Sequence, residues 1–280
     1  MESASKSDSS ITMKPVNYSD SSSVIDALKD QDALIITLGG RVDPAVQNTL
    51  IDAAIQAGVP WILPNEWGSD TAHPEIKRFF FQGSKTPYRE RIEKSGTSSF
   101  IAVVSNQWYD FTLGLGNYFI DIKNRTATIL DSGEVKTVTT TMPQVGRAVA
   151  SLLSLPVAGA SPCVNDWKNK HIYIESFFLS QKEMLAAVQR ATGTSDGDWR
   201  IDRESAEKLV TEGEAQLNKG DFTMTAFRNT LMGMNFWAGH GNDYVATKGT
   251  ANGILELPKE NLDEITKDCV ERTLAGEKWM

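Results

Sequence analysis

The sequence contains few cysteines and histidines. Its 280 residues include two cysteines, Cys163 and Cys269, which do not form a CxxC pair. Their spacing excludes a disulfide framework and a zinc knuckle and favours a reducing compartment. The three histidines, His73, His171 and His240, lie far apart without metal-ligand spacing, so we expect no metal site.

Long apolar runs and an excess of basic residues are also missing. No run of about 18 or more apolar residues occurs, and the Ser-rich first ten residues lack the apolar centre of a signal peptide. We therefore expect a cytosolic protein with no membrane span. The net charge of −8 disfavours a nucleic-acid partner, because nonspecific affinity for phosphate backbones comes mostly from clustered Lys and Arg.

Complete phosphate-binding motifs are absent as well. A GxGxxG fingerprint between strand and helix brings backbone amides and a helix N-terminus to a pyrophosphate, and no stretch has that spacing. Gly39 and Gly40 end an apolar run without it. The GLG at residues 114–116 lacks the third glycine, so we expect a loop or a helix-packing feature there. No Walker A sequence occurs either.

What the first half does contain is an alternation of strand and helix patterns in a chain of ordinary globular composition, with 40% hydrophobic and 23% charged residues. Asp20 is expected to cap one helix, whereas Pro44 begins another that Gly58 ends. The order predicts a parallel, doubly wound sheet with right-handed crossovers. The expected strands are residues 11–16, 33–38, 61–64 and 99–105, and the expected helices are residues 20–29, 44–57 and 84–94.

The second half has a different pattern. A hairpin is expected around Asn124 and Arg125, then a β-rich stretch at residues 135–141 and a helix at residues 142–155. Further helices are expected at residues 180–191, 203–218, 221–233 and 259–274. We therefore predict two intertwined domains with an approximate boundary, a sheet domain at residues 1–155 and a smaller, mostly helical lobe at residues 156–280.

The loop in WILPNEWGSD follows a buried strand at its carboxyl end, where open α/β sheets bind ligands. The alternative is a sharp turn in which Glu66 is a solvated cap and Trp67 packs. Lys85 opens the next helix, whose positive end disfavours the charged amine and could favour proton transfer. The alternative there is an ordinary exposed lysine.

Residues 11–155 resemble the NmrA-like group of atypical short-chain dehydrogenases, particularly its isoflavone reductase and phenylcoumaran benzylic ether reductase branch in the fungal form. The motifs that carry the resemblance cover about half of the chain and follow one another in the same order as in the family. Its motifs are VNYSD, ALKDQDALIITLG, AAIQAGVPWILPNEWGSD, KTPYRERIEKSG, FIAVVSNQWYDF and DIKNRTATILDSGEVKTVTTTMPQVGRAVASLLSLP.

The resemblance implies a Rossmann-like NADPH-dependent reductase. Lys85 would be the catalytic acid/base, and Trp108 and Tyr109 would help to form the wall of the substrate pocket. The residues expected along the cofactor are Thr37, Leu38, Gly39, Gly40, Pro64, Asn65 and Glu66. Glu66 could also orient the lysine or a water molecule.

The sequence departs from the family at its start. In the family a first βαβ unit with the glycine loop precedes the position of Ile11, so we interpret the chain as N-terminally truncated, with residues 33–38 as the family's fourth strand. Loss of the intervening strands would expose the apolar edge of residues 33–38. We predict that residues 11–16 move inward and pair in parallel with that edge.

Two functions remain open from the sequence. The first is an NAD(P)H-dependent oxidoreductase that acts on a small aromatic or polyketide-like molecule, with secondary metabolism as the expected setting. The second is a non-catalytic NmrA-like dinucleotide sensor, regulator or pseudoenzyme that has lost its phosphate loop and could bind a protein partner. The missing loop favours the second function, and the retained Lys85 favours the first.

Overall fold

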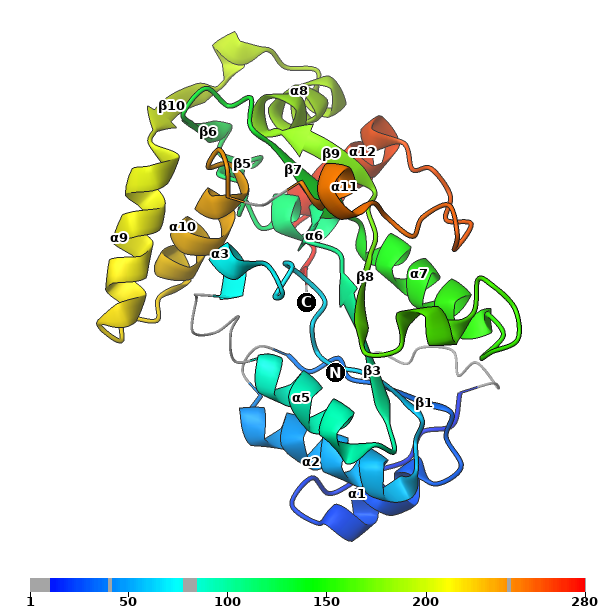
Figure 1. Ribbon diagram of the computed structural model, residues 1–280. Coiled ribbons are helices and arrows are strands. Elements are labelled where there is room, and N and C mark those ends of the chain that lie inside the picture. The colour runs from blue at the N-terminus through cyan, green and yellow to red at the C-terminus, as the bar shows by residue number, and fades with distance from the viewer. Residues whose placement is uncertain (1–10, 40–41, 78–84, 241–242, 280) are drawn as a thin grey trace. The chain divides into compact units, whose positions relative to one another are not determined.

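The computed structural model describes residues 11–39, 42–77, 85–240 and 243–279 (Figure 1). The chain forms two compact units. The first comprises Met1–Asn65, Ser84–Ala102 and Lys168–Lys170, and the second comprises Glu66–Gly83, Val103–Trp167 and His171–Met280. The units therefore do not divide at residue 155, because the chain passes between them several times. No helix in the described ranges is both long and apolar enough to cross a bilayer.

The first unit contains the parallel strands that the sequence predicts. Strand β1 pairs with β2 and β2 pairs with β3, all in parallel. Helices α1, α2 and α5 lie side by side next to them (Figure 1), and Arg91 of α5 donates two hydrogen bonds to Asp52 of α2. The elements are α1 (Ser21–Leu28), β1 (Ala33–Ile35), α2 (Pro44–Ala57), β2 (Trp61–Leu63), α5 (Thr86–Ser95) and β3 (Ser99–Val104).

The ends of these helices follow from local sequence. The Asp20 carboxylate accepts a hydrogen bond from the Ser22 amide and caps α1, as predicted. Pro44 is the first residue of α2, and Gly58 ends it with a φ of 78°, a left-handed conformation in which glycine avoids the Cβ penalty. Buried side chains between helices and strands, among them Ile51, Ile62 and Ile92, form the core of this unit.

The expected strand at residues 11–16 is wrong. Residues 11–17 have no regular secondary structure, and Ile11 and Met13 are 66% and 86% exposed. Strand β1 lies at the edge of the four-stranded sheet β1-β2-β3-β8, and its Ile35 is 41% exposed. The segment does not cover this edge because its apolar residues are too few and too isolated to offset the cost of ordering them.

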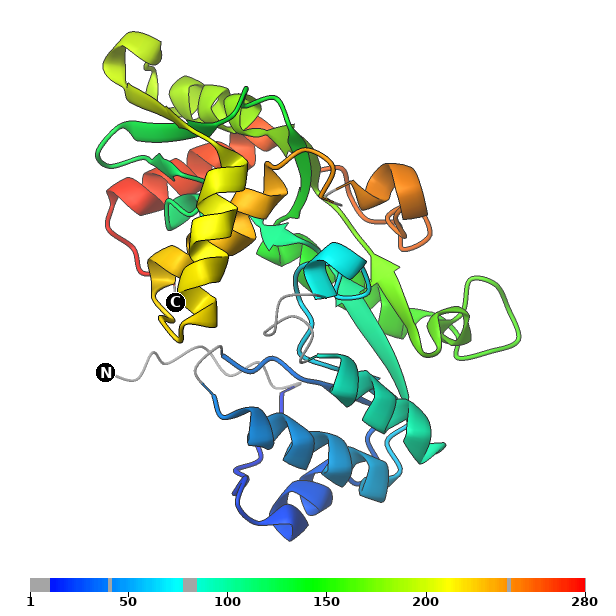
Figure 2. The ribbon, with the colours of Figure 1, turned by 60° about the vertical axis from the view of Figure 1, so that its left-hand side comes forward.

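The second unit holds two small sheets and most of the helices. Strand β6 pairs in parallel with β10 and antiparallel with β5, and β7 pairs with β4 and β9. Helices α9 and α10 pack against each other (Figure 2). The strands are β4 (Gln107–Trp108), β5 (Ile120–Asp121), β6 (Thr126–Leu130), β7 (Lys136–Thr140), β8 (Lys170–Tyr173), β9 (Phe177–Ser180) and β10 (Arg200–Glu204). The helices are α3 (Pro74–Lys77), α6 (Tyr109–Gly114), α7 (Met142–Ser154), α8 (Gln181–Thr192), α9 (Ala206–Asn218), α10 (Met224–Asn235), α11 (Tyr244–Lys248) and α12 (Leu262–Leu274), with 3-10 turns at Val164–Trp167 and Asp196–Asp198.

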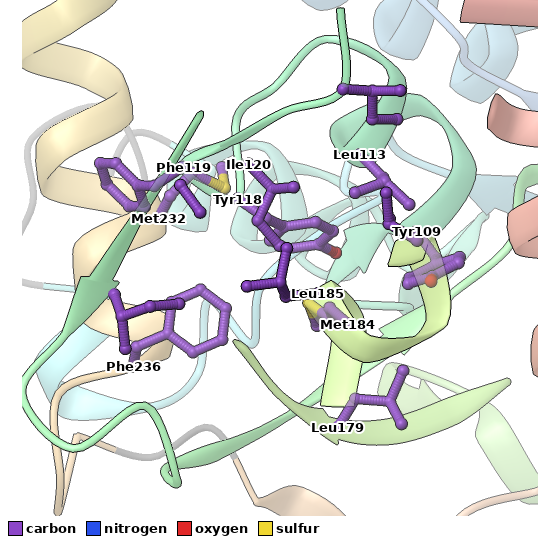
Figure 3. Close-up of a cluster of buried hydrophobic side chains, with 14 of the residues drawn as sticks. Tyr109, Leu113, Tyr118, Phe119, Ile120, Leu179, Met184, Leu185, Met232 and Phe236 are labelled. Atoms are coloured by element: carbon purple, nitrogen blue, oxygen red, sulfur yellow. The ribbon is translucent and has the colours of Figure 1, made fainter. Parts of the chain in front are cut away.

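The core of the second unit combines aromatic and aliphatic side chains (Figure 3). Tyr109, Tyr118 and Phe236 are almost completely buried, and the Tyr118 ring meets that of Phe236 edge-on at 6.1 Å. The predicted hairpin forms as β5 and β6, with Arg125 in its turn at a φ of 49°.

The GLG motif begins at the last residue of α6 and continues into the turn that follows, which agrees with the expected loop or helix-packing feature. A Cβ on Gly114 would lie 2.1 Å from an atom of the Trp279 indole, so only glycine admits that ring.

Candidate active site

The carboxyl ends of β1 and β2 meet at one edge of the first unit. The Ile36 amide donates to the Leu63 carbonyl at 2.9 Å, which extends the parallel ladder past β1. The Asn65 side-chain amide then donates to the Leu38 carbonyl at 3.0 Å. The structure therefore joins two of the residues predicted to lie along a cofactor.

The other predicted residues of this edge differ in exposure. Thr37 and Gly39 are exposed, and Pro64 is buried. A Cβ on Gly39 would meet no atom within 4 Å, so the backbone there is open to a ligand. Gly40 lies outside the described residues.

Glu66 is buried, which contradicts its alternative interpretation as a solvated cap. It is 2% exposed and accepts a hydrogen bond from the Thr71 hydroxyl at 2.5 Å. The Gly68 amide donates to the Glu66 carbonyl at 2.6 Å and closes a tight turn. Glu66 belongs to the second unit, whereas Pro64 and Asn65 belong to the first. Its predicted role beside Lys85 stays a prediction.

The turn is held against the segment that follows β3. The Gly68 carbonyl accepts from the amides of Ser105 and Asn106 at 3.2 and 2.9 Å. The Asn106 side-chain amide donates to the Val138 carbonyl at 2.7 Å, and the Thr139 hydroxyl donates to the Gln107 carbonyl at 2.6 Å. Strand β7 thus uses buried polar groups to fix residues 105–107, directly before the predicted substrate residues.

Lys85 immediately precedes α5 and is half-buried. Its backbone is helical, with φ −78° and ψ −25°, and its side chain makes no capping hydrogen bond to α5. The position at the start of a helix agrees with the prediction. The catalytic role of its amine stays a prediction.

Trp108 and Tyr109 occupy different environments. Trp108 is half-buried, and its ring meets Phe111 edge-on at 5.8 Å. Its indole nitrogen is buried and has no hydrogen-bond partner among the described residues. Tyr109 is 0% exposed, and its hydroxyl is 2.7 Å from that of Thr266. The prediction that Tyr109 lines a substrate pocket is therefore wrong, because its side chain is part of the core.

The sequence analysis missed a polar cluster at the end of the same loop. The Lys248 amine donates to the Asp70 carboxylate at 2.6 Å and to the Tyr173 hydroxyl at 2.7 Å. The Tyr173 hydroxyl donates to Asp70 at 3.3 Å. Asp70 was visible in WILPNEWGSD, but nothing in the sequence points to partners more than 100 residues away.

The cluster holds the loop in place through hydrogen bonds and an ion pair. Burial raises the pKa of Tyr173 above its ordinary value. Burial also acts to lower the pKa of Lys248, but the hydrogen bonds with Asp70 and Tyr173 outweigh it and raise that pKa. The tyrosine therefore stays protonated and the lysine stays charged.

The sequence is similar to that of a known protein family. Residues 2–209 match the NmrA-like family over most of the chain. The chain belongs to the NmrA-like family. This confirms the resemblance on which the candidate residues depend.

Individual NmrA-like relatives agree in sequence or in fold. The oxidoreductase aprR of Aspergillus flavus is 29% identical over 270 residues, which are 94% of this chain and 85% of the relative. A crystal structure of isoflavone reductase superposes with a TM-score of 0.68 at 17% identity, covering 90% of this chain and 79% of the other. The NADPH complex of leucoanthocyanidin reductase from Vitis vinifera gives 0.69 at 14% identity, covering 91% and 84%. The predicted Rossmann-like α/β fold is thereby confirmed.

Proposed function

We propose that this protein is an NADPH-dependent oxidoreductase that reduces a small aromatic or polyketide-like molecule. Membership of the NmrA-like family carries the proposal, together with a relative described as an oxidoreductase. The solved neighbours include an isoflavone reductase and a leucoanthocyanidin reductase with NADPH. The aromatic substrate class extends from those two names, and secondary metabolism is the setting that we infer from it.

The residues at the strand edge fit the nicotinamide end of a dinucleotide. The Asn65 side chain ties β2 to β1, and a Cβ added at Gly39 would meet no atom within 4 Å, so a ligand could approach the backbone there. Ligands of parallel α/β sheets bind beyond the carboxyl ends of the strands.

The roles of the protein groups follow from their chemistry. Thr37, Leu38 and Asn65 would hold the cofactor, which supplies the hydride when bound. Lys85 would exchange a proton with the substrate, a role that is generally worth about 10²–10⁴-fold in rate. Trp108 would form an apolar wall, and Glu66 would act through its hydrogen bond with Thr71 to keep the loop in place.

Titration with NADPH, followed by turnover assays on aryl carbonyl and quinone substrates, tests the proposal. Wild-type protein should quench its tryptophan fluorescence on binding NADPH and then oxidise it in the presence of substrate. Lys85→Ala should still bind NADPH and lose about 10²-fold or more of the turnover rate. Lys94→Ala is the matched control, because Lys94 lies on the same helix with a side chain that is 77% exposed.

The possible results separate the two functions. Binding without turnover on every substrate would favour the dinucleotide sensor. Equal turnover by Lys85→Ala and wild type would remove Lys85 from the mechanism. If neither NADPH nor NADH bound, both functions would be rejected.

A further inference from the structure

Arg228, on α10, is a half-buried arginine without a carboxylate partner among the described residues. Its one hydrogen bond in that part of the chain runs from Nη2 to the Asn229 side chain at 3.5 Å, the long limit for such a bond. Its Nε is buried and has no partner there. A guanidinium presents five donors, so most of its hydrogen-bonding capacity is unused.

The arginine lines a cavity of about 290 Å³ in the second unit. Strands β6 and β10 and helices α9 and α10 contribute its walls, and Figure 1 labels all four. Phe119 and Leu209 supply apolar surface. The polar lining residues are Thr128, Asp202, Arg203, Glu204, Arg228 and Asn229.

The carboxylates of this cavity are committed to other groups. Glu204 accepts hydrogen bonds from the Ser205 amide at 3.0 Å and from Lys208 at 3.1 Å. Asp202 pairs with Arg200 at 3.3 Å. Neither acid therefore neutralises Arg228.

Burial leaves the charge of Arg228 incompletely compensated. It lowers the pKa of the guanidinium, and no carboxylate acts in the opposite direction. The Phe119 ring, 5.0 Å from the guanidinium carbon, offsets part of the desolvation through a cation–π contact. Partial burial of a cation without an anion costs stability, and a bound anion would offset that cost.

We propose that this cavity binds a small monocarboxylate through the Arg228 guanidinium. A planar guanidinium pairs with a carboxylate through two parallel hydrogen bonds. Phe119 and Leu209 suit a small apolar body attached to the carboxylate. Phosphate has no apolar body to place against Phe119 and Leu209, so it should bind more weakly than a carboxylate that has one. The site shares no residue with the proposed cofactor edge and stands independently of the proposed function.

Calorimetric titration with benzoate as the probe tests the site at constant ionic strength. Wild type should bind with a Kd below about 1 mM, and the neutral isostere benzamide should bind at least about tenfold more weakly. Arg228→Lys keeps the charge but loses the two parallel N–H donors of the guanidinium, and it should weaken benzoate binding about tenfold. Arg228→Met should abolish binding. Lys267→Met, which removes an exposed cation of α12 that does not line the cavity, should leave binding unchanged.

Thermal unfolding without ligand supplies a second readout. Arg228→Met should melt at the same temperature as wild type or higher, because the uncompensated charge is gone. Benzoate should raise the melting temperature of wild type and not that of the variant. The proposal is overturned if Arg228→Lys binds benzoate as wild type does, if benzamide binds equally well, or if phosphate binds more tightly than benzoate.

Discussion

Lys248 and Asp70 are 178 residues apart in the sequence and form an ion pair of 2.6 Å. The Asp70 side chain is 4% exposed, whereas that of Lys248 is 36% exposed at the end of α11. The pair therefore attaches the loop after β2 to a helix near the other end of the chain. Because this loop includes Glu66, the pair holds part of the candidate active site in place.

Replacing Lys248 by Met should destabilise the protein by about 1–2 kcal/mol. Loss of one partner of a fully buried pair costs about 3–5 kcal/mol, and partial exposure of the lysine reduces that cost. Lys208→Met is the matched control, since Lys208 forms an exposed i,i+4 pair with Glu204, and its loss should change the stability much less. Urea unfolding measures both. If both variants lost the same amount of unfolding free energy, the ion pair with Asp70 would contribute no more than an exposed one.

Sequence signals located the helices because those signals are local. A cap acts within a few residues, so Asp20, Pro44 and Gly58 fix helix ends that can be read directly. The parallel order of β1, β2 and β3 follows from alternation with helices.

The incorrect predictions concern residues whose secondary structure or burial depends on partners that are distant in the sequence. A strand needs a neighbouring strand to pair with, and residues 11–16 pair with none in the described part of the chain. The direction of an aromatic side chain cannot be read from its neighbours in sequence, so Tyr109 resembled a pocket residue as much as Trp108 did. Nothing in the sequence distinguishes Asp70 or Arg228 from ordinary surface charges, because burial and the presence or lack of a partner are properties of the folded chain.

Tyr109→Phe tests the assignment of Tyr109 to the core. The change removes the hydrogen bond between the Tyr109 and Thr266 hydroxyls, and it should cost about 1 kcal/mol of unfolding free energy. The Thr266 hydroxyl still donates to the Leu262 carbonyl, which limits the loss. The KM for any substrate should not change. A several-fold rise in KM at unchanged stability would restore Tyr109 to the pocket.

Both cysteines should resist thiol reagents in the folded protein. Cys163 and Cys269 are 5% and 0% exposed, and burial raises the pKa of Cys269 to about 12. The thiolate is the reactive form, so Cys269 is protected twice at neutral pH. Titration with a chromogenic disulfide should find no fast-reacting thiol in native protein and two in denaturant. A fast-reacting thiol in Cys163→Ser would contradict the burial of Cys269.

Asp110→Asn should change how stability depends on pH. Asp110 is 7% exposed, and burial raises its pKa above the ordinary 3.8, although its carboxylate accepts a hydrogen bond from the Met142 amide. Above the folded-state pKa the native protein carries a buried charge. As the pH falls from that value towards 3.8, the folded state takes up the proton first, so this group makes the protein more stable.

Asparagine keeps an oxygen for the Met142 amide and carries no charge, so the variant lacks this gain. The difference in unfolding free energy between Asp110→Asn and wild type should therefore be most favourable to the variant at neutral pH and shrink on acidification. Asp198→Asn should show the opposite pH dependence. Hydrogen bonds from the Ser195 amide and hydroxyl lower the pKa of Asp198, so the stability that its carboxylate contributes is lost in acid. Urea unfolding of the three proteins across this pH range measures both slopes. A pH-independent difference between Asp110→Asn and wild type would mean that the Asp110 carboxylate is better solvated than its burial indicates.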